Sequence, residues 1–473
     1  MYSIADKEIQ DMNNGEWEIY CPKMVITKND GSEIWKGTGN IKWNRDRKLS
    51  YSLYTPCKNP VSSCFLFTAL NSKSNNDGKF LMEESEFYTL NATDLRNRSW
   101  KSENLSDLKF STYSDPLLIV SGDLHKIEFY KKITDVCIIN QKKLKNICFV
   151  CYEFNEHQFP VTTEINTVTK IAGNFKSCNR NLDVAVFSAG GFDFEISKTD
   201  CGLRFEAFSE KPKNLPKFLL SNIRESFQFV LGRPIEWDVV TYNCNIYEFM
   251  RVVSWKNKTR NTRTPPPIKH SYLPNENLAI WQLFDCYLTY VQKHCANVEH
   301  SRMTVRLWNI LQGSSSSWSV EKLTLVVEIE GLVQDSFKNT ITPSLPMQST
   351  ADMVSKCIKN HRQEELSDAD EKALNNILAI LGTLKSCSSA LNILRHLSKQ
   401  GIVRNEDVKA WSEMRPKAAH GGGINFVDNE CQLCSQLYVL FYHLIFSLIG
   451  YSGSYTDYGQ AHMPNMDYEC IKI

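Results

Sequence analysis

An arginine and a histidine stand five positions apart in the stretch "WSEMRPKAAHGGG", which runs from Trp411 to Gly423. A guanidinium is always charged and can bind a phosphate through two parallel hydrogen bonds. An imidazole has a pKa near ~6.5, so it can accept or donate a proton at neutral pH. Arg415 and His420 are therefore the first candidates for chemistry in this chain.

A purely structural explanation covers only part of this stretch. Gly421–Gly423 can end a helix, because glycine adopts the left-handed conformation of a helix terminus, and the helix dipole favours a charged His420 there. Neither effect requires Arg415. Five positions on an ideal helix advance by ~500°, which leaves Arg415 and His420 about 140° apart. They converge only if the helix ends between them, as Pro416 and the glycines favour, or if a second copy supplies the partner residues.

The length of 473 residues predicts two or three domains, and 42% hydrophobic and 23% charged residues are ordinary for a globular protein. The net charge of +1 argues against a chain coated in basic charge. Any contact with nucleic acid must then be a local patch.

We expect a cytoplasmic protein. The N-terminal stretch "MYSIADKEIQDMNNGEWEIY" lacks the apolar core of a signal peptide, so the 16 cysteines should be reduced thiols. The longest apolar run lies within Leu437–Gly450 and contains His443. It is shorter than the ~20 residues that span a membrane, so it predicts a buried core helix.

Alternating apolar and polar residues indicate strands in the first half of the chain. Leu49, Tyr51 and Leu53 alternate with serines, and the stretches "FDFEI" and "LRFEAF" repeat the pattern. The run Leu117–Val120 could be a fully buried strand. Several short strands with short connections predict an antiparallel sandwich or an open barrel. Within this half, residues 220–232 predict one short helix.

Three ranges follow from these patterns. Residues 1–253 form a β-rich domain, residues 254–273 form a basic linker or exposed connection with three consecutive prolines, and residues 274–473 form a helical domain. The basic linker is read as a solvated loop, with contact to RNA as the alternative. Within the helical domain, the core of the bundle is expected at about residues 320–460.

Apolar stripes at helical spacing support the helical assignment. The first stripe comprises Leu278, Trp281, Phe284, Leu288 and Val291. A second comprises Leu374, Ile377, Leu378 and Leu381, in a helix opened by Ser367 and Asp370 at the spacing of a capping box. The last long helix is expected from about Glu430 to Ile449.

The cysteine pairs do not predict a metal site. Cys148 and Cys151, and Cys431 and Cys434, each have a gap of two residues, but the pairs lie far apart in the sequence and lack the glycine or proline of zinc knuckles. Buried thiols that act as small apolar side chains are the favoured interpretation. We expect neither a metal nor a cofactor.

The segment "MRPKAAHGG" resembles the signature of HEPN domains, helical bundles found in many bacterial toxins and defence ribonucleases. Their motif is arginine, four to six residues, then histidine, near the start of the last long helix. The segment "LIFSLIGYSGSYTDYG", Leu444–Gly459, resembles the closing segment of the ApeA-like HEPN branch. That branch carries a β-rich N-terminal domain before its helical domain, and this chain has the same layout.

The resemblance implies an α+β protein of two domains, with a sandwich-like antiparallel N-terminal domain followed by an all-α HEPN bundle. It implies a metal-independent endoribonuclease of anti-phage defence by abortive infection, with tRNA as one possible substrate. His420 would act as general base or acid, and Arg415 would hold the scissile phosphate. Attack by the RNA 2′-hydroxyl would yield a 2′,3′-cyclic phosphate.

Partners follow from the same resemblance. Two protomers would face each other through the helical domain, and the N-terminal domain would sense an unknown phage trigger. Lys417 and Arg395 are candidate RNA contacts, although a solvated or packing role is the plainer explanation for each.

Two other functions stay open. The residue after the motif arginine is often polar in catalytic HEPN members, whereas here it is Pro416, which also disfavours helical geometry at Arg415. A non-catalytic module for interaction or RNA binding is therefore the main alternative. A carbohydrate-binding or hydrolytic β-sandwich is the third possibility, but no pair of carboxylates in the strands supports it.

Overall fold

The structure is a computed structural model that divides into two compact units. The first unit comprises Met1–Asn214 and Glu236–Lys258, and the second comprises Leu215–Ile235 and Thr259–Ile473. The residues described are 2–31, 33–56, 87–106, 108–114, 117–132, 147–154, 159–162, 164–171, 174–181, 184–199, 202–209, 218–244, 247–254, 263–271, 274–295, 297–340, 345–360, 367–386, 389–419 and 428–471.

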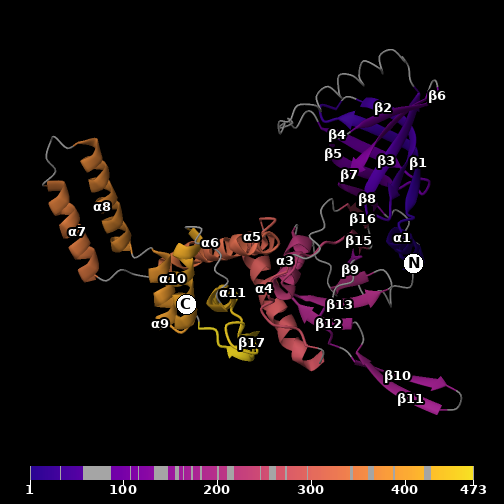
Figure 1. The fold of residues 1–473 in the computed structure, drawn as a ribbon. Coiled ribbons are helices and arrows are strands. Elements are labelled where there is room, and N and C mark those ends of the chain that lie inside the picture. The colour runs from indigo at the N-terminus through magenta and orange to yellow at the C-terminus, as the bar shows by residue number, and fades with distance from the viewer. Residues whose placement is uncertain are drawn as a thin grey trace. The chain divides into compact units, whose positions relative to one another are not determined.

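The first unit is built on one 14-stranded sheet in which every neighbouring pair is antiparallel. The strand order is β12-β13-β14-β9-β15-β16-β8-β5-β4-β1-β2-β3-β7-β6 (Figure 1). The strands are β1 (Glu18–Lys28), β2 (Glu33–Trp43), β3 (Leu49–Pro56), β4 (Tyr88–Thr93), β5 (Ser99–Leu105), β6 (Lys109–Ser114), β7 (Leu117–Leu124), β8 (Lys126–Lys132), β9 (Ile147–Glu153), β12 (Val184–Ala189), β13 (Phe192–Thr199), β14 (Gly202–Phe208), β15 (Val239–Cys244) and β16 (Tyr247–Val253). Helix α1 (Tyr2–Asn13) precedes the sheet, and β10 (Glu164–Ile171) and β11 (Asn174–Asn181) form a separate hairpin.

The prediction of an antiparallel β-rich N-terminal region is confirmed. The alternation in β3 buries Leu49, Tyr51 and Leu53, and the alternation in β13 buries Phe194 and Ile196. The strands are joined in a single hydrogen-bonded sheet instead of the two sheets of a sandwich. This sheet curls, because β5 comes into contact with β7 although four strands separate them in the order.

The prediction of a fully buried strand at Leu117–Val120 is wrong. In β7 only the alternate residues Leu118 and Val120 are buried, and Leu117 and Ile119 are half-buried. Successive side chains of a strand point to opposite faces, and one face of this part of the sheet is not fully covered. The continuous apolar run Leu117–Val120 is therefore fully buried on only one face of the sheet.

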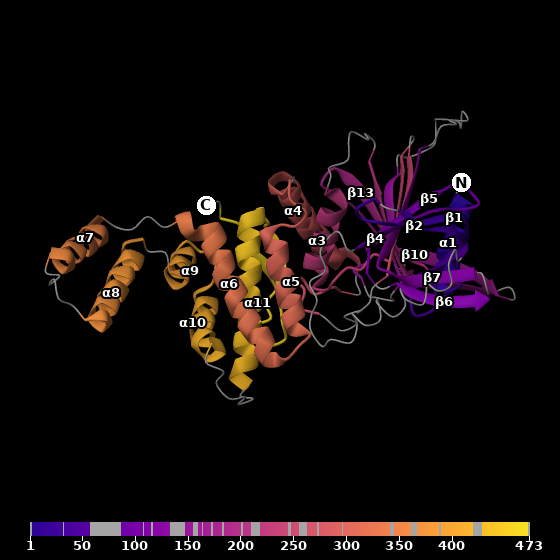
Figure 2. The ribbon, with the colours of Figure 1, turned by 90° about the horizontal axis from the view of Figure 1, so that it is seen from above.

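The second unit is helical, as predicted for the C-terminal part of the chain. Its elements are α3 (Leu219–Leu231), η3 (Pro274–Asn277), α4 (Leu278–His294), α5 (Arg302–Ser314), α6 (Trp318–Phe337), η4 (Lys338–Thr340), α7 (Leu345–Asn360), α8 (Asp368–Ser386), α9 (Ala390–Lys399), α10 (Asn405–Ala419), α11 (Asp428–Ile449), β17 (Gly453–Thr456) and β18 (Asn465–Tyr468). Helix α6 packs against α5, α9, α10 and α11, which makes it the centre of the bundle (Figure 2). The predicted short helix is α3, and it belongs to this unit by its contacts with α4 and α5.

Most of the first predicted apolar stripe is buried. In α4, Trp281, Phe284, Leu288 and Val291 are each at most 3% exposed. Leu278 is the exception, at 49% exposed, because it is the first residue of the helix and precedes the part that packs against α3. Helical periodicity thus located the buried face but not the point at which burial begins.

The predicted linker is packed where the structure describes it. Backbone carbonyls of Pro265 and Pro266 accept hydrogen bonds from Tyr442 and Tyr458 (2.7 Å for Tyr458), and the carbonyl of Pro267 accepts one from the Thr456 backbone N–H at 3.0 Å. The following residue, Ile268, is 2% exposed. Proline lacks a donor but keeps its carbonyl acceptor, which is why a proline run can be anchored by hydroxyl and amide donors. The basic residues 255–262 lie outside the described residues.

Helix α11 is the one described helix with the length and composition of a membrane span, and 72% of its apolar window is buried inside the protein. Leu437, Leu440, Leu444 and Ile445 are each fully enclosed. The prediction of a buried core helix is therefore confirmed, and this burial is consistent with a soluble protein.

Candidate functional site

Arg415 lies near the end of α10, which continues through Pro416 to Ala419. The expectation that Pro416 would disfavour helical geometry at Arg415 is wrong. Proline in a helix removes one backbone hydrogen bond and strains the preceding turn. Helix α10 nevertheless packs against α6, α9 and α11, and these tertiary contacts outweigh the local cost.

Two neighbours orient the Arg415 side chain. Its Nε and Nη2 atoms donate hydrogen bonds of 2.9 Å each to the two carboxylate oxygens of Glu330 on α6. Its guanidinium carbon also lies 5.6 Å from the ring centroid of Trp411, one turn earlier on α10. A carboxylate in this bidentate arrangement occupies one of the two edges through which a guanidinium binds a phosphate.

Burial and a hydrogen bond to α6 hold the Trp411 ring beneath Arg415 in place. Trp411 is 1% exposed, and its indole Nε1 donates a hydrogen bond of 3.2 Å to the backbone carbonyl of Val326. Val326 and Glu330 are one turn apart on α6, so a single stretch of this helix fixes both the ring and the carboxylate. The Arg415 side chain itself remains 53% exposed and is open to a ligand.

His420 and Gly421–Gly423 lie outside the described residues, which resume at Asp428. Helix α10 is described as far as Ala419. The convergence of Arg415 and His420 and the distance between them stay predictions.

The two candidate RNA contacts lie on the surface of the same bundle. Lys417 is 45% exposed and pairs with Glu413 of its own helix at 2.8 Å, an ordinary i, i+4 ion pair. Arg395 is exposed on α9, whose opposite side buries Ile393 and Leu394. Lys417 follows Arg415 by two positions on the helix, an advance of ~200°, so the two side chains project in different directions. The structure therefore does not bring Lys417 and Arg415 together.

The first turn of α10 is tied to the chain beyond α11. Arg404 donates to both carboxylate oxygens of Asp407, at 2.8 and 2.9 Å, and to both of Asp457, at 3.1 Å for Nη2. Asp407 and Asp457 are completely buried. Asp457 also accepts hydrogen bonds from the Gly459 backbone and from Gln460. This Arg404 clamp fixes the helix that carries Arg415.

A buried histidine lies in the aromatic core beside this clamp. His443 on α11 is 2% exposed, with its ring centroid 4.6 Å from that of Tyr455 and 4.9 Å from that of Tyr468. Burial lowers the pKa of His443 to about 3, and the charge of Arg404 acts in the same direction. The neutral imidazole is therefore the form that the folded protein holds.

This burial predicts an acid-sensitive fold. The pKa of His443 is about 3 in the folded protein and ~6.5 in the unfolded chain. The stability that depends on a neutral His443 is therefore fully present above pH ~6.5, and it is lost as the pH falls from ~6.5 towards 3, because the unfolded chain binds a proton that the folded protein excludes. The free energy of unfolding should drop by about 2 kcal/mol between pH 7.5 and pH 5 from this group alone. Urea unfolding at the two pH values measures the drop. His443→Phe should reduce it, whereas His462→Asn, at an exposed position, should leave it unchanged.

The cysteine pairs separate into buried and exposed thiols. Cys151 and Cys434 are buried, and burial raises the pKa of Cys434 to about 12. The expectation of buried thiols is wrong for Cys431, which is exposed in the first turn of α11, ahead of Leu433, the first residue of this helix described as buried. Among the described residues, no group of three or more histidine, cysteine or acidic side chains could hold a metal ion.

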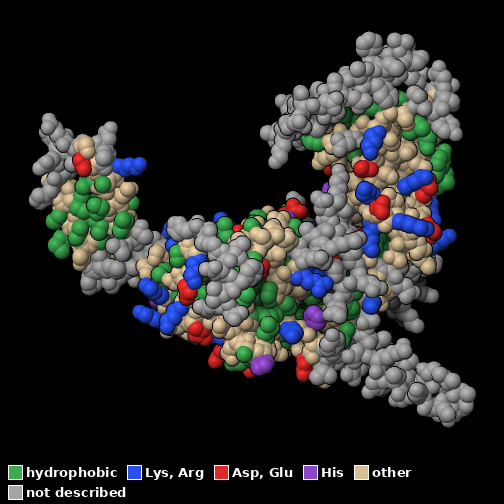
Figure 3. Space-filling model, viewed as in Figure 1, with side chains coloured by type: hydrophobic (Ala, Val, Ile, Leu, Met, Phe, Trp, Pro, Cys, Tyr) green, Lys and Arg blue, Asp and Glu red, His purple; other side chains and the backbone are tan. Residues whose placement is uncertain are grey.

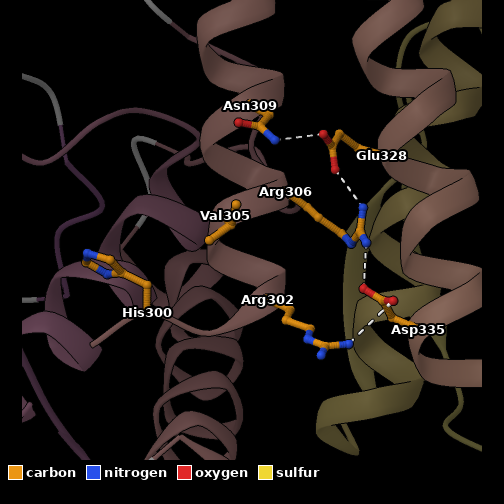
Figure 4. Close-up of a pocket in the computed structure, with 7 residues that line it drawn as sticks. All are labelled: His300, Arg302, Val305, Arg306, Asn309, Glu328 and Asp335. Atoms are coloured by element: carbon orange, nitrogen blue, oxygen red, sulfur yellow. Dashed lines mark hydrogen bonds and ion pairs between the residues drawn. The ribbon is translucent and has the colours of Figure 1, made fainter. Parts of the chain in front are cut away.

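A polar pocket of about 270 Å³ lies between α5 and α6 (Figure 4). Arg306 bridges Glu328 at 2.7 Å and Asp335 at 2.6 Å, and Arg302 lies 3.4 Å from Asp335. These charges neutralise one another and hold the two helices together. Glu328 and Glu330 differ by ~200° around α6, so this pocket and Arg415 lie on different sides of the helix.

Comparison with protein-family models finds no match, and comparisons with curated proteins and with solved structures find no significant match.

The sequence did not predict the residues that orient Arg415. Trp411 could have been found, because it precedes Arg415 by four positions and these positions are neighbours on a helix. Glu330 lies 85 residues away in the sequence and carried no local signal. The same is true of Asp457, which meets Arg404 only after the chain has passed through α11.

Proposed function

We propose that the chain is a HEPN-type endoribonuclease that cleaves RNA without a metal ion. The single observation that supports this proposal best is the presentation of Arg415. Its guanidinium is exposed, oriented by Trp411 and Glu330, and carried on the helix that leads to His420 in the sequence. The arrangement suits an anion that must be held next to a group that transfers protons.

The chemistry needs RNA, water and the two side chains. His420 accepts the proton of the ribose 2′-hydroxyl while water protonates the departing 5′-oxygen, or His420 protonates the 5′-oxygen while water accepts the proton of the 2′-hydroxyl. The 2′-oxygen forms a bond with phosphorus, and the bond from phosphorus to the 5′-oxygen breaks. Arg415 stabilises the negative charge on the phosphate oxygens. The products are a 2′,3′-cyclic phosphate and a 5′-hydroxyl, and DNA is resistant because it lacks the nucleophile.

Glu330 competes with the substrate for Arg415. The Arg415 side chain is 53% exposed and the Glu330 side chain is 34% exposed, so their ion pair contributes about 1 kcal/mol or less. A phosphate that offers the same two-oxygen geometry can therefore displace the carboxylate at small cost. The ion pair keeps the guanidinium in position until RNA arrives.

The biological role that fits this chemistry is anti-phage defence by abortive infection, as in the ApeA-like HEPN branch. The β-rich unit would sense the phage trigger, two copies would pair through the helical unit, and tRNA is a candidate substrate. This role places the protein in the cytoplasm. The proposal draws on the sequence motif, the order of β-rich and helical regions and the exposed arginine.

A second function is a non-catalytic RNA-binding or interaction module. Two observations favour it: Pro416 offers no polar side chain next to the arginine, and Arg415 already has a carboxylate partner. This module would bind RNA, or none, and leave it intact under every condition.

The two functions are separated by incubating the full-length protein with total tRNA and ribosomal RNA in the presence of a chelator. Wild type should cut RNA and leave 2′,3′-cyclic phosphate ends, and His420→Ala should leave it intact at equal thermal stability. Cutting that persists in His420→Ala would contradict the assigned mechanism, and RNA binding without cutting by the wild type would favour the second function.

A further inference from the structure

Helices α7 and α8 form a hairpin with almost no core of its own. The two helices lie side by side and pack against each other (Figures 1 and 2). Among the side chains of α7 and α8 that the structure describes, Ala351 alone is buried. The capping box at Ser367 and Asp370 forms as predicted, with the Asp370 backbone N–H 3.3 Å from the Ser367 hydroxyl. Helix α8 therefore begins where the sequence indicates, but none of its described apolar residues is fully buried.

Among the described side chains of this hairpin, four large apolar ones are exposed, and they are here called the arm face. They are Met353 at 59% exposed, Val354 at 38%, Ile377 at 47% and Ile380 at 60%. The sequence predicted an apolar stripe on α8, and its members Leu374, Leu378 and Leu381 are half-buried. Figure 3 shows hydrophobic side chains gathered over both helices. A contiguous apolar surface of this kind marks an interaction site.

Charged residues of both signs flank the arm face at the tip of the hairpin. Lys356 is exposed one turn after Met353 on α7. Asp370 is exposed two turns before Ile377 on α8, so it lies on the same side of that helix. The end of α7 and the start of α8 meet at the tip, which therefore carries a cation on one helix and an anion on the other.

We propose that the arm face pairs with the arm face of a second copy of this chain, forming a four-helix bundle with the two tips together. In such a bundle each α7 lies between its own α8 and the α8 of the other copy. Lys356 of one copy then lies beside Asp370 of the other, twice by symmetry. A surface that carries an apolar stripe and both charges is complementary to itself, as a two-fold interface requires.

The size of the hairpin is suited to pairing with the same hairpin of a second copy. Helix α8 has 19 residues and is ~28 Å long, and two adjacent helices are ~20 Å across. One face of the hairpin therefore offers an area of the same order as the ~800 Å² that each partner buries in a stable interface. A membrane surface fits less well, because membrane-bound helices carry an excess of basic residues on their polar face, whereas here Asp370 flanks the stripe. This pairing deepens the proposed function, which includes a dimer through the helical unit, and association and RNA cleavage are measured separately, so each can fail without the other.

The pairing is tested by sedimentation equilibrium of the full-length protein over a range of concentrations. Wild type should be dimeric. The double variant Ile377→Glu, Ile380→Glu should dissociate at least about tenfold more readily, because it places two charges in the shared core. Both side chains are largely exposed in the single chain, so its circular dichroism and Tm should change little. Val186→Glu, at an exposed apolar position of β12, is the matched control and should stay dimeric.

A charge exchange identifies the second copy as the occupant. Lys356→Glu should weaken the dimer, and Lys356→Glu combined with Asp370→Lys should restore it, since the pairing of opposite charges is recovered with reversed sign. The proposal is overturned if the wild type stays monomeric, if the double isoleucine variant is as dimeric as wild type, or if the charge exchange fails to restore the association. Vesicle binding by a monomeric wild type would point to a membrane instead.

Discussion

Arg415→Ala is expected to reduce the rate of RNA cleavage by about 10²–10³-fold, the cost of removing one well-placed group that stabilises charge in a transition state. Arg415→Lys should recover little of the loss, because an ammonium cannot reproduce the two parallel hydrogen bonds that Arg415 makes with Glu330 and would make with a phosphate. Single-turnover cleavage of a defined RNA measures the effect. Lys409→Ala, at an exposed position of the same helix, is the matched control and should cleave at the wild-type rate.

The Glu330 carboxylate next to Arg415 should affect RNA binding in the opposite sense to Arg415 itself. Glu330→Gln removes the competing charge, so RNA affinity should rise, by less than about tenfold because the ion pair is exposed. Arg415→Ala and Glu330→Gln should therefore act in opposite directions. If both variants lose cleavage to the same extent, the positioning of Arg415 by Glu330 outweighs any competition with RNA, and the competition assigned to Glu330 is wrong.

Asp457→Ala is expected to cause the largest loss of stability, about 3 kcal/mol in the free energy of unfolding. Asp457 is completely buried and accepts hydrogen bonds from Arg404, the Gly459 backbone and Gln460. Removing the carboxylate leaves half of the Arg404 guanidinium without an acceptor, while Asp407 still holds the other half. This remaining partner keeps the loss at the lower end of what breaking a buried ion pair costs.

Urea unfolding at pH 7.5 measures this loss. Asp467→Ala is the control, because Asp467 is an exposed aspartate of the same C-terminal hairpin and bonds only the Ser454 hydroxyl among its described contacts, at 3.0 Å. The control should lose less than about 1 kcal/mol. Equal losses in the two variants would mean that the hairpin as a whole, and not the Arg404 clamp, supports the fold.

Local patterns in the sequence predicted the elements well but their surroundings poorly. The alternation at Leu49, Tyr51 and Leu53 and the spacing of Trp281 and Phe284 report which side of an element is apolar, and these side chains are buried. The pattern in α8 is just as regular, yet Ile377 and Ile380 are exposed. Periodicity shows which face of an element is apolar, and only the tertiary structure shows whether another element buries that face.

The candidate site shows the same limit. Arg415 was found from its spacing to His420, and Trp411 lies within reach of the same reasoning. Glu330 and the Arg404 clamp depend on contacts between segments separated by tens of residues, which no local pattern encodes. The prediction that Pro416 disfavours a helix at Arg415 was wrong because it rested on local sequence alone. The packing of α10 against three other helices decides the conformation of this segment.

The anchoring of the proline run and the Arg404 clamp has a consequence for the order in which the protein is made. Residues 451–468 hold Pro266 and Pro267, at the entrance to the helical unit, and Arg404, at the start of the helix that carries Arg415. A ribosome synthesises the Arg415 helix well before these residues. The growing chain therefore carries its candidate reactive arginine on an incompletely supported helix until residues 451–468 have been synthesised and folded back.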